Sequence, residues 1–445
     1  MNLINTIWKK WRGDFLLQKV VRNSGYLLGS NVFSIIQSIF TGRLLGIMGF
    51  GIIGTITTFA STLNRLFSFR MNELVVKYYG QYKENGEPQK AAAVVKAALL
   101  AEGSSAMLSF LICVLFARFA AAELADDIAL APFFILYGTI ILANVFTETA
   151  TGVLQVNNRF RDQAFLHLAS SIVTAVVIVW AYIIKGGLQE VIIAYLLGKF
   201  IIGIGTAVIG FVELRKSLGE GWWKVSFELL PPLKELVGFA VSTNISSTII
   251  LLVRDNEVLW VAYFLSPLEA GYVKTALAII NLVLLPITPF ISTTYPEINR
   301  TVAQRQWTKL KDLLRSVTFI SAAWTGFTSI ALVLFGRWFL LFYGPEFQPA
   351  YIPMLLLLIG LGFANILFWN RPLLLSLGLP LVPYKISLWL GLAKIGLAFL
   401  LVPKFGLNAE ALLLSLFFVI SISWIVFIGI KEIRKQESIR QASAA

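Results

Sequence analysis

Long apolar stretches recur along the whole chain and alternate with short polar segments. A helix needs about 20 consecutive apolar residues to cross the hydrocarbon core of a bilayer. The sequence lacks the weak alternation in segments of about ten residues that marks outer-membrane barrels, so helices are the remaining way to span. The pattern predicts an all-α polytopic membrane protein with about twelve spans, at 26–45, 50–69, 91–116, 132–156, 164–184, 191–211, 236–265, 271–295, 317–335, 351–369, 386–401 and 409–430.

The amino-acid composition supports this prediction and narrows the chemistry. Of the 445 residues, 57% are hydrophobic and 14% are charged, whereas soluble domains have about 45–50% and about 25%. The positive-inside rule accounts for the net charge of +13 without a nucleic-acid partner. Cys113 and His167 are the only residues of their types. We therefore predict no disulfide, no metal site, no cofactor, no catalytic residues and no enzymatic activity.

The distribution of basic residues predicts the orientation. Most of the 37 Lys and Arg residues lie at the two chain ends and in alternate loops, which places those segments on the cytoplasmic side of the inner (plasma) membrane. The opposite loops hold only Arg43, Arg118, Lys185, Arg337 and Lys404. Apolar and basic residues at helical spacing in segment 1–22 predict an amphipathic helix on the inner membrane face, with an unstructured basic tail as the alternative.

Two pairs of similar turns indicate an internal repeat. Gly51 and Gly271 follow related turns 220 residues apart, and Lys185 and Lys404 begin another pair 219 residues apart. Six helices per half give both halves the same orientation, with a pseudo-two-fold axis along the membrane normal. The repeat predicts an N-terminal six-helix lobe at 23–212, a cytoplasmic linker at 213–235, a C-terminal six-helix lobe at 236–430 and a cytoplasmic tail at 431–445.

Polar and ionisable side chains inside the predicted spans are the candidate functional residues. An ionisable group costs about 2.5–3.5 kcal/mol at membrane depth, so it usually faces a cavity or a partner. The strongest charges are cationic and favour an anionic ligand group such as a phosphate. The alternatives are helix packing for the small polar residues, structural ion pairs, and basic side chains that extend to the interface. The predicted substrate cavity comprises Arg65, Arg254, Lys274, Gln37, Asn244 and Asn281, and the ion-coupling candidates are Glu148 and Asp255.

Four short motifs resemble one known family. They are Gly-Arg-Leu-Leu-Gly at 42–46 with Phe50-Gly51, Arg254-Asp255 followed by Glu-Ala-Gly-Tyr at 269–272, Tyr-Gly-Pro-Glu-Phe at 343–347, and Phe-Gly-Leu-Asn-Ala at 405–409. Together they resemble the polysaccharide-transport flippases of the multidrug/oligosaccharidyl-lipid/polysaccharide exporter superfamily.

The resemblance implies two lobes in a V shape, alternating access, and transport of a polyprenyl-pyrophosphate-linked oligosaccharide from the inner to the outer leaflet. It also implies contact with membrane lipids, and glycosyltransferases and a polysaccharide polymerase as partners, with no covalent chemistry.

Three other functions remain open from the sequence. A multidrug or organic-ion antiporter of the same superfamily would prefer an acidic cavity for its cations. A membrane polysaccharide polymerase or glycosyltransferase needs catalytic carboxylates or a sizeable outer loop, and the predicted outer loops are short. A non-transporting scaffold would not need ionisable groups at mid-depth in both lobes.

Overall fold

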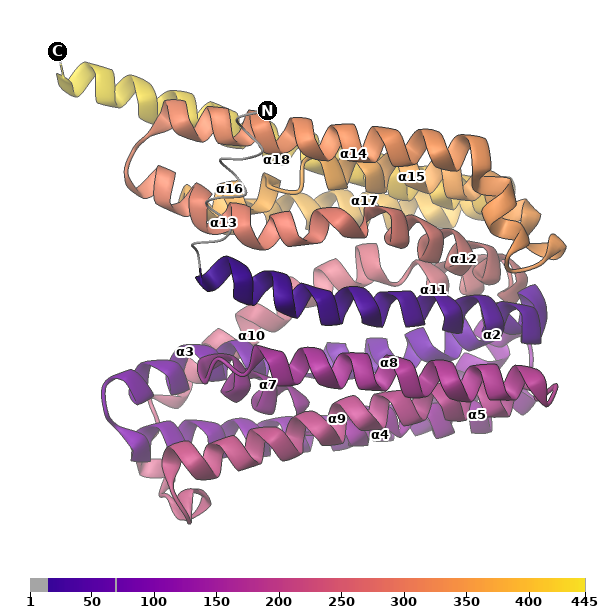
Figure 1. The fold of residues 1–445 in the computed structure, drawn as a ribbon, viewed down its shortest axis with the longest axis horizontal. Coiled ribbons are helices and arrows are strands. Elements are labelled where there is room, and N and C mark those ends of the chain that lie inside the picture. The colour runs from indigo at the N-terminus through magenta and orange to yellow at the C-terminus, as the bar shows by residue number, and fades with distance from the viewer. Residues whose placement is uncertain (1–14, 69, 445) are drawn as a thin grey trace. The chain divides into compact units, whose positions relative to one another are not determined.

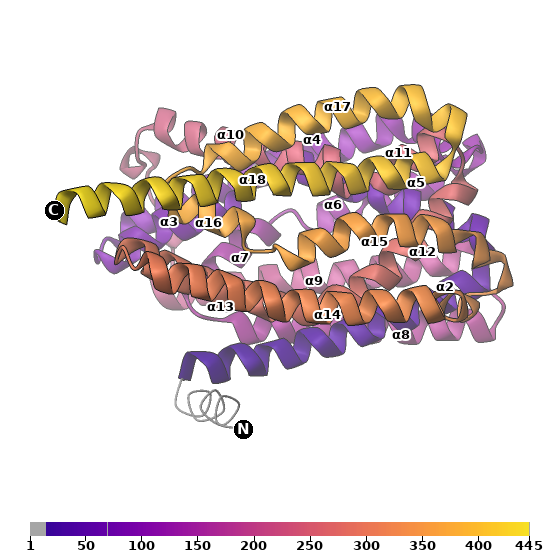
Figure 2. The ribbon, with the colours of Figure 1, turned by 90° about the horizontal axis from the view of Figure 1, so that it is seen from above.

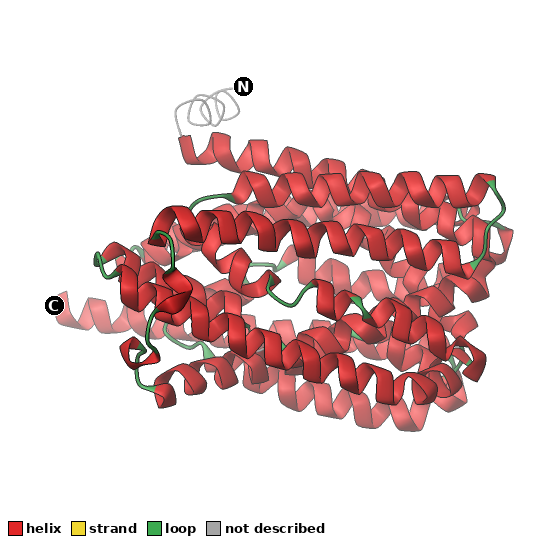
Figure 3. Ribbon diagram, turned by 90° about the horizontal axis from the view of Figure 1, so that it is seen from below, coloured by secondary structure: helices red, strands yellow, loops and turns green. Residues whose placement is uncertain are grey.

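A computed structural model describes residues 15–68 and 70–444, and in this part of the chain every regular element is a helix (Figure 1, Figure 3). The predicted amphipathic segment at 1–22 lies largely outside the described residues. The α-helices are α2 (Phe15–Phe67), α3 (Met71–Glu84), α4 (Pro88–Ala125), α5 (Ala131–Gly138), α6 (Ile140–Ala143), α7 (Thr147–Val156), α8 (Phe160–Ile183), α9 (Leu188–Leu218), α10 (Leu233–Ile250), α11 (Glu257–Phe264), α12 (Pro267–Leu284), α13 (Thr288–Ala303), α14 (Trp307–Leu341), α15 (Tyr351–Ile366), α16 (Asn370–Ser376), α17 (Leu381–Phe405) and α18 (Leu407–Ala444).

Within the described residues, 10 helical stretches are long and apolar enough to cross a membrane. The first of them covers two of the predicted spans, because α2 consists of two helices that meet at a kink at Gly46. That glycine has a positive φ of 66°, which a residue without a side chain adopts at no steric cost. The predicted span at 236–265 is absent from the 10 because a π-helical turn, Leu251–Asp255, divides it into α10 and α11. The prediction of an all-α polytopic membrane protein is confirmed.

The chain divides into two compact units. Unit 1 comprises Met1–Leu45 and Ile56–Thr248, and unit 2 comprises Gly46–Thr55 and Ile249–Ala445. Helix α2 therefore contributes to both units.

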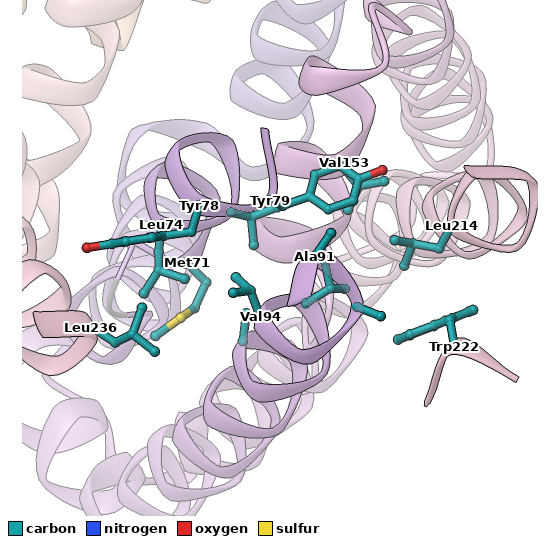
Figure 4. Close-up of a cluster of buried hydrophobic side chains, with 14 of the residues drawn as sticks. Met71, Leu74, Tyr78, Tyr79, Ala91, Val94, Val153, Leu214, Trp222 and Leu236 are labelled. Atoms are coloured by element: carbon teal, nitrogen blue, oxygen red, sulfur yellow. The ribbon is translucent and has the colours of Figure 1, made fainter. Parts of the chain in front are cut away.

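The core of unit 1 at one end of its helices gathers side chains from α3, α4, α7 and α9 (Figure 4). Tyr79 is fully buried there, and its hydroxyl lies 3.0 Å from the Ser217 hydroxyl. The neighbouring Tyr78 donates a hydrogen bond of 2.8 Å to Glu235. These polar contacts attach the end of α9 and the start of α10 to an otherwise apolar cluster. It consists of Met71, Leu74, Val75, Tyr78, Tyr79, Ala91, Ala92, Val94, Val95, Ala98, Val153, Leu214, Trp222, Leu236 and Ala240.

Polar side chains in the first half of α2 pack this helix against α8. The Ser30 and Ser171 hydroxyls lie 2.6 Å apart, and the Gln37 amide donates a 2.8 Å hydrogen bond to the Ser171 carbonyl. Gln37 is only 7% exposed. Small polar residues allow helices to approach closely and supply hydrogen bonds between them. Helices α8 and α9 then run side by side (Figure 1).

Unit 2 packs α15 and α17 against α18 (Figure 2). A Cβ at Gly360 would meet the backbone of Ser415, so α15 and α18 approach each other at this point. The Ser415 hydroxyl donates to the Leu356 carbonyl and accepts from the Gly360 N–H at 3.1 Å. A second apolar cluster joins α13, α14, α16 and α18 around Trp307, Leu310, Trp369, Leu373 and Ile433.

The two glycines of the predicted repeat face each other inside unit 2. A Cβ at Gly51 would meet the Pro267 carbonyl, and a Cβ at Gly271 would meet the Ile47 carbonyl. The two pairs are reciprocal, since Ile47 and Pro267 have the same offset of 220 residues as Gly51 and Gly271. A local two-fold relation between the starts of the two helices produces such a reciprocal contact.

Several predicted spans are divided into shorter helices. The span at 132–156 consists of α5, α6 and α7, with a break between Ala143 and Thr147. A helix of the span at 351–369 ends at Ile366 and restarts as α16 at Asn370. In the span at 271–295 a 3-10 turn, Leu285–Ile287, contains Pro286, whose missing N–H and ring disfavour a continuous helix. Breaks inside membrane helices require other partners for the freed backbone groups.

Candidate functional site

The π-helical turn in unit 2 positions Arg254. A π-helical turn widens the helix and is frequent at functional sites. The indole N–H of Trp260 donates a 2.8 Å hydrogen bond to the Leu252 carbonyl at this turn. The Arg254 side chain is 57% exposed, lies 3.4 Å from the Asp255 carboxylate and packs over the Phe418 ring at 5.8 Å. Its guanidinium is therefore oriented yet accessible.

A second arginine comes from the break between α15 and α16. The Asn370 amide donates a 2.7 Å hydrogen bond to the Leu367 carbonyl and thereby satisfies an acceptor at the break. The next residue, Arg371, donates to the Tyr384 hydroxyl and stacks over that ring at 4.9 Å. In the sequence Arg371 lies in the basic segment between the predicted spans 351–369 and 386–401. The signal that could have revealed its position is Asn-Arg-Pro at 370–372, directly after an apolar run.

Arg254 and Arg371 line one cavity of about 630 Å³ in unit 2. This volume lies within the range of about 300–1,000 Å³ that is typical of small-molecule sites. Its other polar lining residues are neutral, and they are Asn281, Asn365, Asn370, Tyr384, Ser387 and Ser421. Apolar side chains from α12, α15 and α18 form most of the remaining wall.

The charge of this wall determines what it can bind. Among the described lining residues both charged side chains are arginines, and none is acidic. A guanidinium presents donors in a planar fork that matches phosphate and carboxylate oxygens. The amide and hydroxyl groups can hydrogen-bond sugar hydroxyls. The cavity is therefore suited to an anionic, hydroxyl-rich ligand.

The structure brings only two of the predicted substrate residues to this cavity, Arg254 and Asn281. The Lys274 ammonium instead donates to the Phe50 carbonyl at 3.2 Å and lies over the Phe50 ring at 4.1 Å. Asn244 donates a 3.1 Å hydrogen bond to the Leu66 carbonyl in unit 1. Gln37 is used in helix packing, as described above. Arg65 is exposed near the end of α2 in unit 1.

The two ion-coupling candidates have different surroundings. Asp255 neighbours Arg254 at 3.4 Å in unit 2. Glu148 is half-buried in the first turn of α7 in unit 1, where it lines a smaller polar cavity. Glu102, another ionisable residue inside a predicted span, is buried beside Glu148 and accepts hydrogen bonds from the backbone N–H groups of Glu148 and Thr149.

A family model described as "Polysaccharide biosynthesis protein" matches residues 16–302. The chain belongs to the polysaccharide biosynthesis protein family. The family region includes α2 through the end of α12 and most of α13. Among curated proteins, the inner membrane protein YghQ of Escherichia coli (strain K12) is 24% identical over 304 residues, which cover 66% of this chain and 83% of that protein. This relative supports a multi-pass inner-membrane location.

Solved structures give the fold of this family member. A multidrug resistance MATE transporter of the MOP superfamily in an inward-facing conformation has a TM-score of 0.75 at 12% identity, over 92% of this chain and 96% of that one. The lipid II flippase MurJ in an inward closed conformation has a TM-score of 0.69 at 15% identity, over 94% and 90%. With the family match, this exporter fold confirms the resemblance to the polysaccharide-transport branch of the superfamily.

Proposed function

We propose that this protein is a flippase that moves a polyprenyl-pyrophosphate-linked oligosaccharide from the inner to the outer leaflet by alternating access, for the synthesis of surface polysaccharide. Transport would take place after glycosyltransferases have built the lipid-linked oligosaccharide and before a polymerase joins these units. The protein itself forms and breaks no covalent bond in this scheme.

The cationic cavity of unit 2 carries the proposal. Pyrophosphate needs cationic donors, and Arg254 and Arg371 supply two guanidinium groups on one wall. The sugars would contact neutral side chains such as Asn281 and Ser387. The polyprenyl chain is apolar and can remain in the bilayer, so the cavity needs to enclose only the polar part of the cargo. Arg65 of unit 1, which the sequence analysis selected for the same headgroup, remains part of this proposal.

The same observation distinguishes this function from multidrug export, although the two types of transporter share a fold. An organic cation would meet two arginines and no acidic side chain among the described residues that line the cavity. Placing like charges together is unfavourable, especially where water is largely excluded. The cavity of unit 2 therefore favours an anionic cargo.

The experiment replaces each arginine in a strain whose surface polysaccharide depends on this gene. Arg254→Ala and Arg371→Ala should abolish polymer export at near-normal protein levels, because each removes a donor to the pyrophosphate. Arg254→Lys should restore part of the export, since the charge remains but the planar fork does not. Arg300→Ala is the matched control, because Arg300 is exposed, pairs with Glu297 and does not line the cavity.

Transport by purified protein in liposomes separates the two cargo classes. A short polyprenyl-pyrophosphate disaccharide should cross in the unmutated protein and fail to cross in either alanine variant. Full export in both alanine variants would reject the assignment of the cavity. Transport of ethidium that persists in these variants would favour the multidrug function instead.

The predicted orientation can be tested on the same protein. We expect Ser217→Cys and Ser438→Cys to resist an impermeant thiol reagent added from outside, whereas Asp126→Cys should react. A Cys113→Ala background removes the buried native thiol. Labelling of Ser217→Cys from outside would invert the proposed topology.

A further inference from the structure

A helix break in unit 1 exposes backbone donors to a buried carboxylate. Helix α6 ends at Ala143 and α7 begins at Thr147, so the first N–H groups of α7 lack partners within the helix. Glu102 of α4 is 3% exposed and accepts from the Glu148 N–H at 2.7 Å and the Thr149 N–H at 3.0 Å. Both oxygens of Glu102 are thus engaged in capping the N-terminus of α7.

A polar cavity of about 160 Å³ lies beside this cap, entirely within unit 1. Its volume corresponds to about five water molecules at about 30 Å³ each. Helices α2, α4 and α7 and the break before α7 form its walls. The lining residues are Asn64, Phe67, Ser68, Glu102, Ser105, Ala106, Ser109, Asn144, Thr147 and Glu148.

One polar group on this wall has no partner. Ser109 is 1% exposed, its hydroxyl oxygen is buried, and it forms no hydrogen bond with another protein group. A buried hydroxyl without a partner costs about 1–3 kcal/mol. By contrast, Ser105 one turn earlier donates 2.9 Å to the Glu102 carbonyl on its own helix. The Ser109 hydroxyl is therefore an available oxygen ligand on the wall of this cavity.

We propose that this cavity binds a sodium ion, with the Glu148 carboxylate as its charged ligand and side-chain oxygens of Ser109, Asn64 and Asn144 as neutral ligands. Hard cations prefer oxygen ligands of this kind. Glu102 adds negative charge to the cavity wall, but both of its oxygens accept hydrogen bonds from the α7 backbone and are not expected to bind the ion. One available carboxylate matches a monovalent ion better than a divalent ion. Amide and hydroxyl oxygens favour a metal ion over a bare proton, which needs only a carboxylate.

The charged groups around Glu148 supply a competitor for the ion. They are Glu102 on α4, Arg65 on α2, Arg70 just before α3, and Glu73 in the first turn of α3. Arg70 and Glu73 form an ion pair with each other. Arg70 interacts with the Glu148 carboxylate more strongly than Arg65 does, and the Asn72 N–H also donates to this carboxylate. A sodium ion would compete with these two guanidinium groups as the positive partner of Glu148.

This exchange deepens the proposed function and rests on it for its physiological role. A cation that binds one state of a transporter better than the other shifts the equilibrium between the states. The sodium site itself is defined by unit 1 alone, so it can be tested without the cargo.

The test measures sodium binding to the purified full-length protein. Equilibrium binding of radioactive sodium, and thermal unfolding in NaCl against choline chloride at equal ionic strength, should show a saturable effect. Glu148→Gln should weaken binding by at least about tenfold, because it removes a charged ligand. Ser109→Ala should weaken binding several-fold. Ser104→Ala is the matched control on α4, since Ser104 is exposed and donates to the Ala101 carbonyl.

Arg65→Ala should change the sodium affinity in the opposite direction. Removal of the competing guanidinium should tighten sodium binding several-fold, which a merely destabilising substitution would not do. The proposal fails if sodium has no saturable effect, if acid alone reproduces the stabilisation, or if Glu148→Gln and Ser109→Ala bind sodium like the unmutated protein. Intact sodium binding together with failed cargo transport in the unmutated protein would count against the proposed function and leave this site standing.

Discussion

Each unit of the molecule holds a pair of neighbouring glutamates inside its helices, and the surroundings of the two pairs differ. In unit 2, Glu257 of α11 and Glu410 of α18 surround Lys394 of α17, and all three residues are at most 4% exposed. The Lys394 ammonium pairs with Glu257 and lies 2.9 Å from a Glu410 oxygen. In unit 1, Glu102 caps α7 and Glu148 faces a polar cavity.

The difference shows how a buried charge can be made permanent or exchangeable. A lysine is a covalently attached cation, so the unit 2 cluster keeps its positive charge in every state and joins three helices. In unit 1, the Glu102 carboxylate accepts hydrogen bonds from the N-terminus of α7, whereas the Glu148 carboxylate borders the cavity. Buried ion pairs contribute little net stability but are very costly to break by removal of one partner. We therefore expect substitutions in unit 2 to act on folding, and substitutions at Glu148 to act on ion binding.

The largest effect is expected at Lys394. Lys394→Met should lower the free energy of unfolding by about 3–5 kcal/mol, because it leaves two uncompensated carboxylates in a dry site. Unfolding in mixed micelles with increasing SDS measures the change. Lys385→Met is the control, since Lys385 is exposed on the same helix. A triple variant that also carries Glu257→Gln and Glu410→Gln should recover much of the loss. Near-wild-type stability of Lys394→Met alone would contradict a structural role for the cluster.

An intermediate effect is expected at Glu102. Glu102→Gln should lower the free energy of unfolding by about 2 kcal/mol, because hydrogen bonds to a charged group contribute about 1.5–3 kcal/mol. The glutamine amide keeps one acceptor oxygen, but its NH₂ group replaces the second oxygen and faces a backbone N–H, so that two donors meet. The same SDS titration applies, with Glu84→Gln as the exposed control on α3. If Glu102→Gln left the free energy of unfolding unchanged, the hydrogen bonds from Glu102 to α7 would not be what stabilises the helix break.

The smallest effect on stability is expected at Glu148. Glu148→Gln should change the free energy of unfolding by less than about 1 kcal/mol, because Glu148 is half-buried and accepts a backbone hydrogen bond from Asn72, whereas Glu102 is buried and accepts two. Its effect should appear instead as lost sodium binding and as export that no longer depends on a sodium gradient. A loss of stability as large as that at Lys394, with gradient dependence unchanged, would make Glu148 a structural ion-pair residue and erase the difference between the units.

The sequence predicted the spans well but did not predict the break before α7. Apolar periodicity located α8, α9 and α14 because each is a long uninterrupted run that lipid must surround. It did not locate the break before α7, since residues 143–147 carry no proline or glycine. That break exists because Glu102, 46 residues away from Glu148, satisfies the freed backbone. Only contacts between helices can stabilise such an irregularity at membrane depth.

The sequence placed the candidate residues inside spans but could not say which of them lie together. Depth in a span marked Arg254 and Glu148, since a charge there needs a partner or a cavity. The same criterion also selected Lys274 and Gln37, which the fold uses for contacts with Phe50 and Ser171. Helical spacing gives the face of one helix, yet it does not say which neighbouring helix covers that face.

By itself the sequence determined the environment, the helical class and the family resemblance, because the bilayer demands long apolar helices whatever their neighbours are. Tertiary structure alone decided which polar groups meet. It joined Arg371 to Arg254 in one cavity and enclosed Lys394 between Glu257 and Glu410. The physical reason is that a buried charge is stable only beside partners from other helices, and the packing of helices separated by many residues selects those partners.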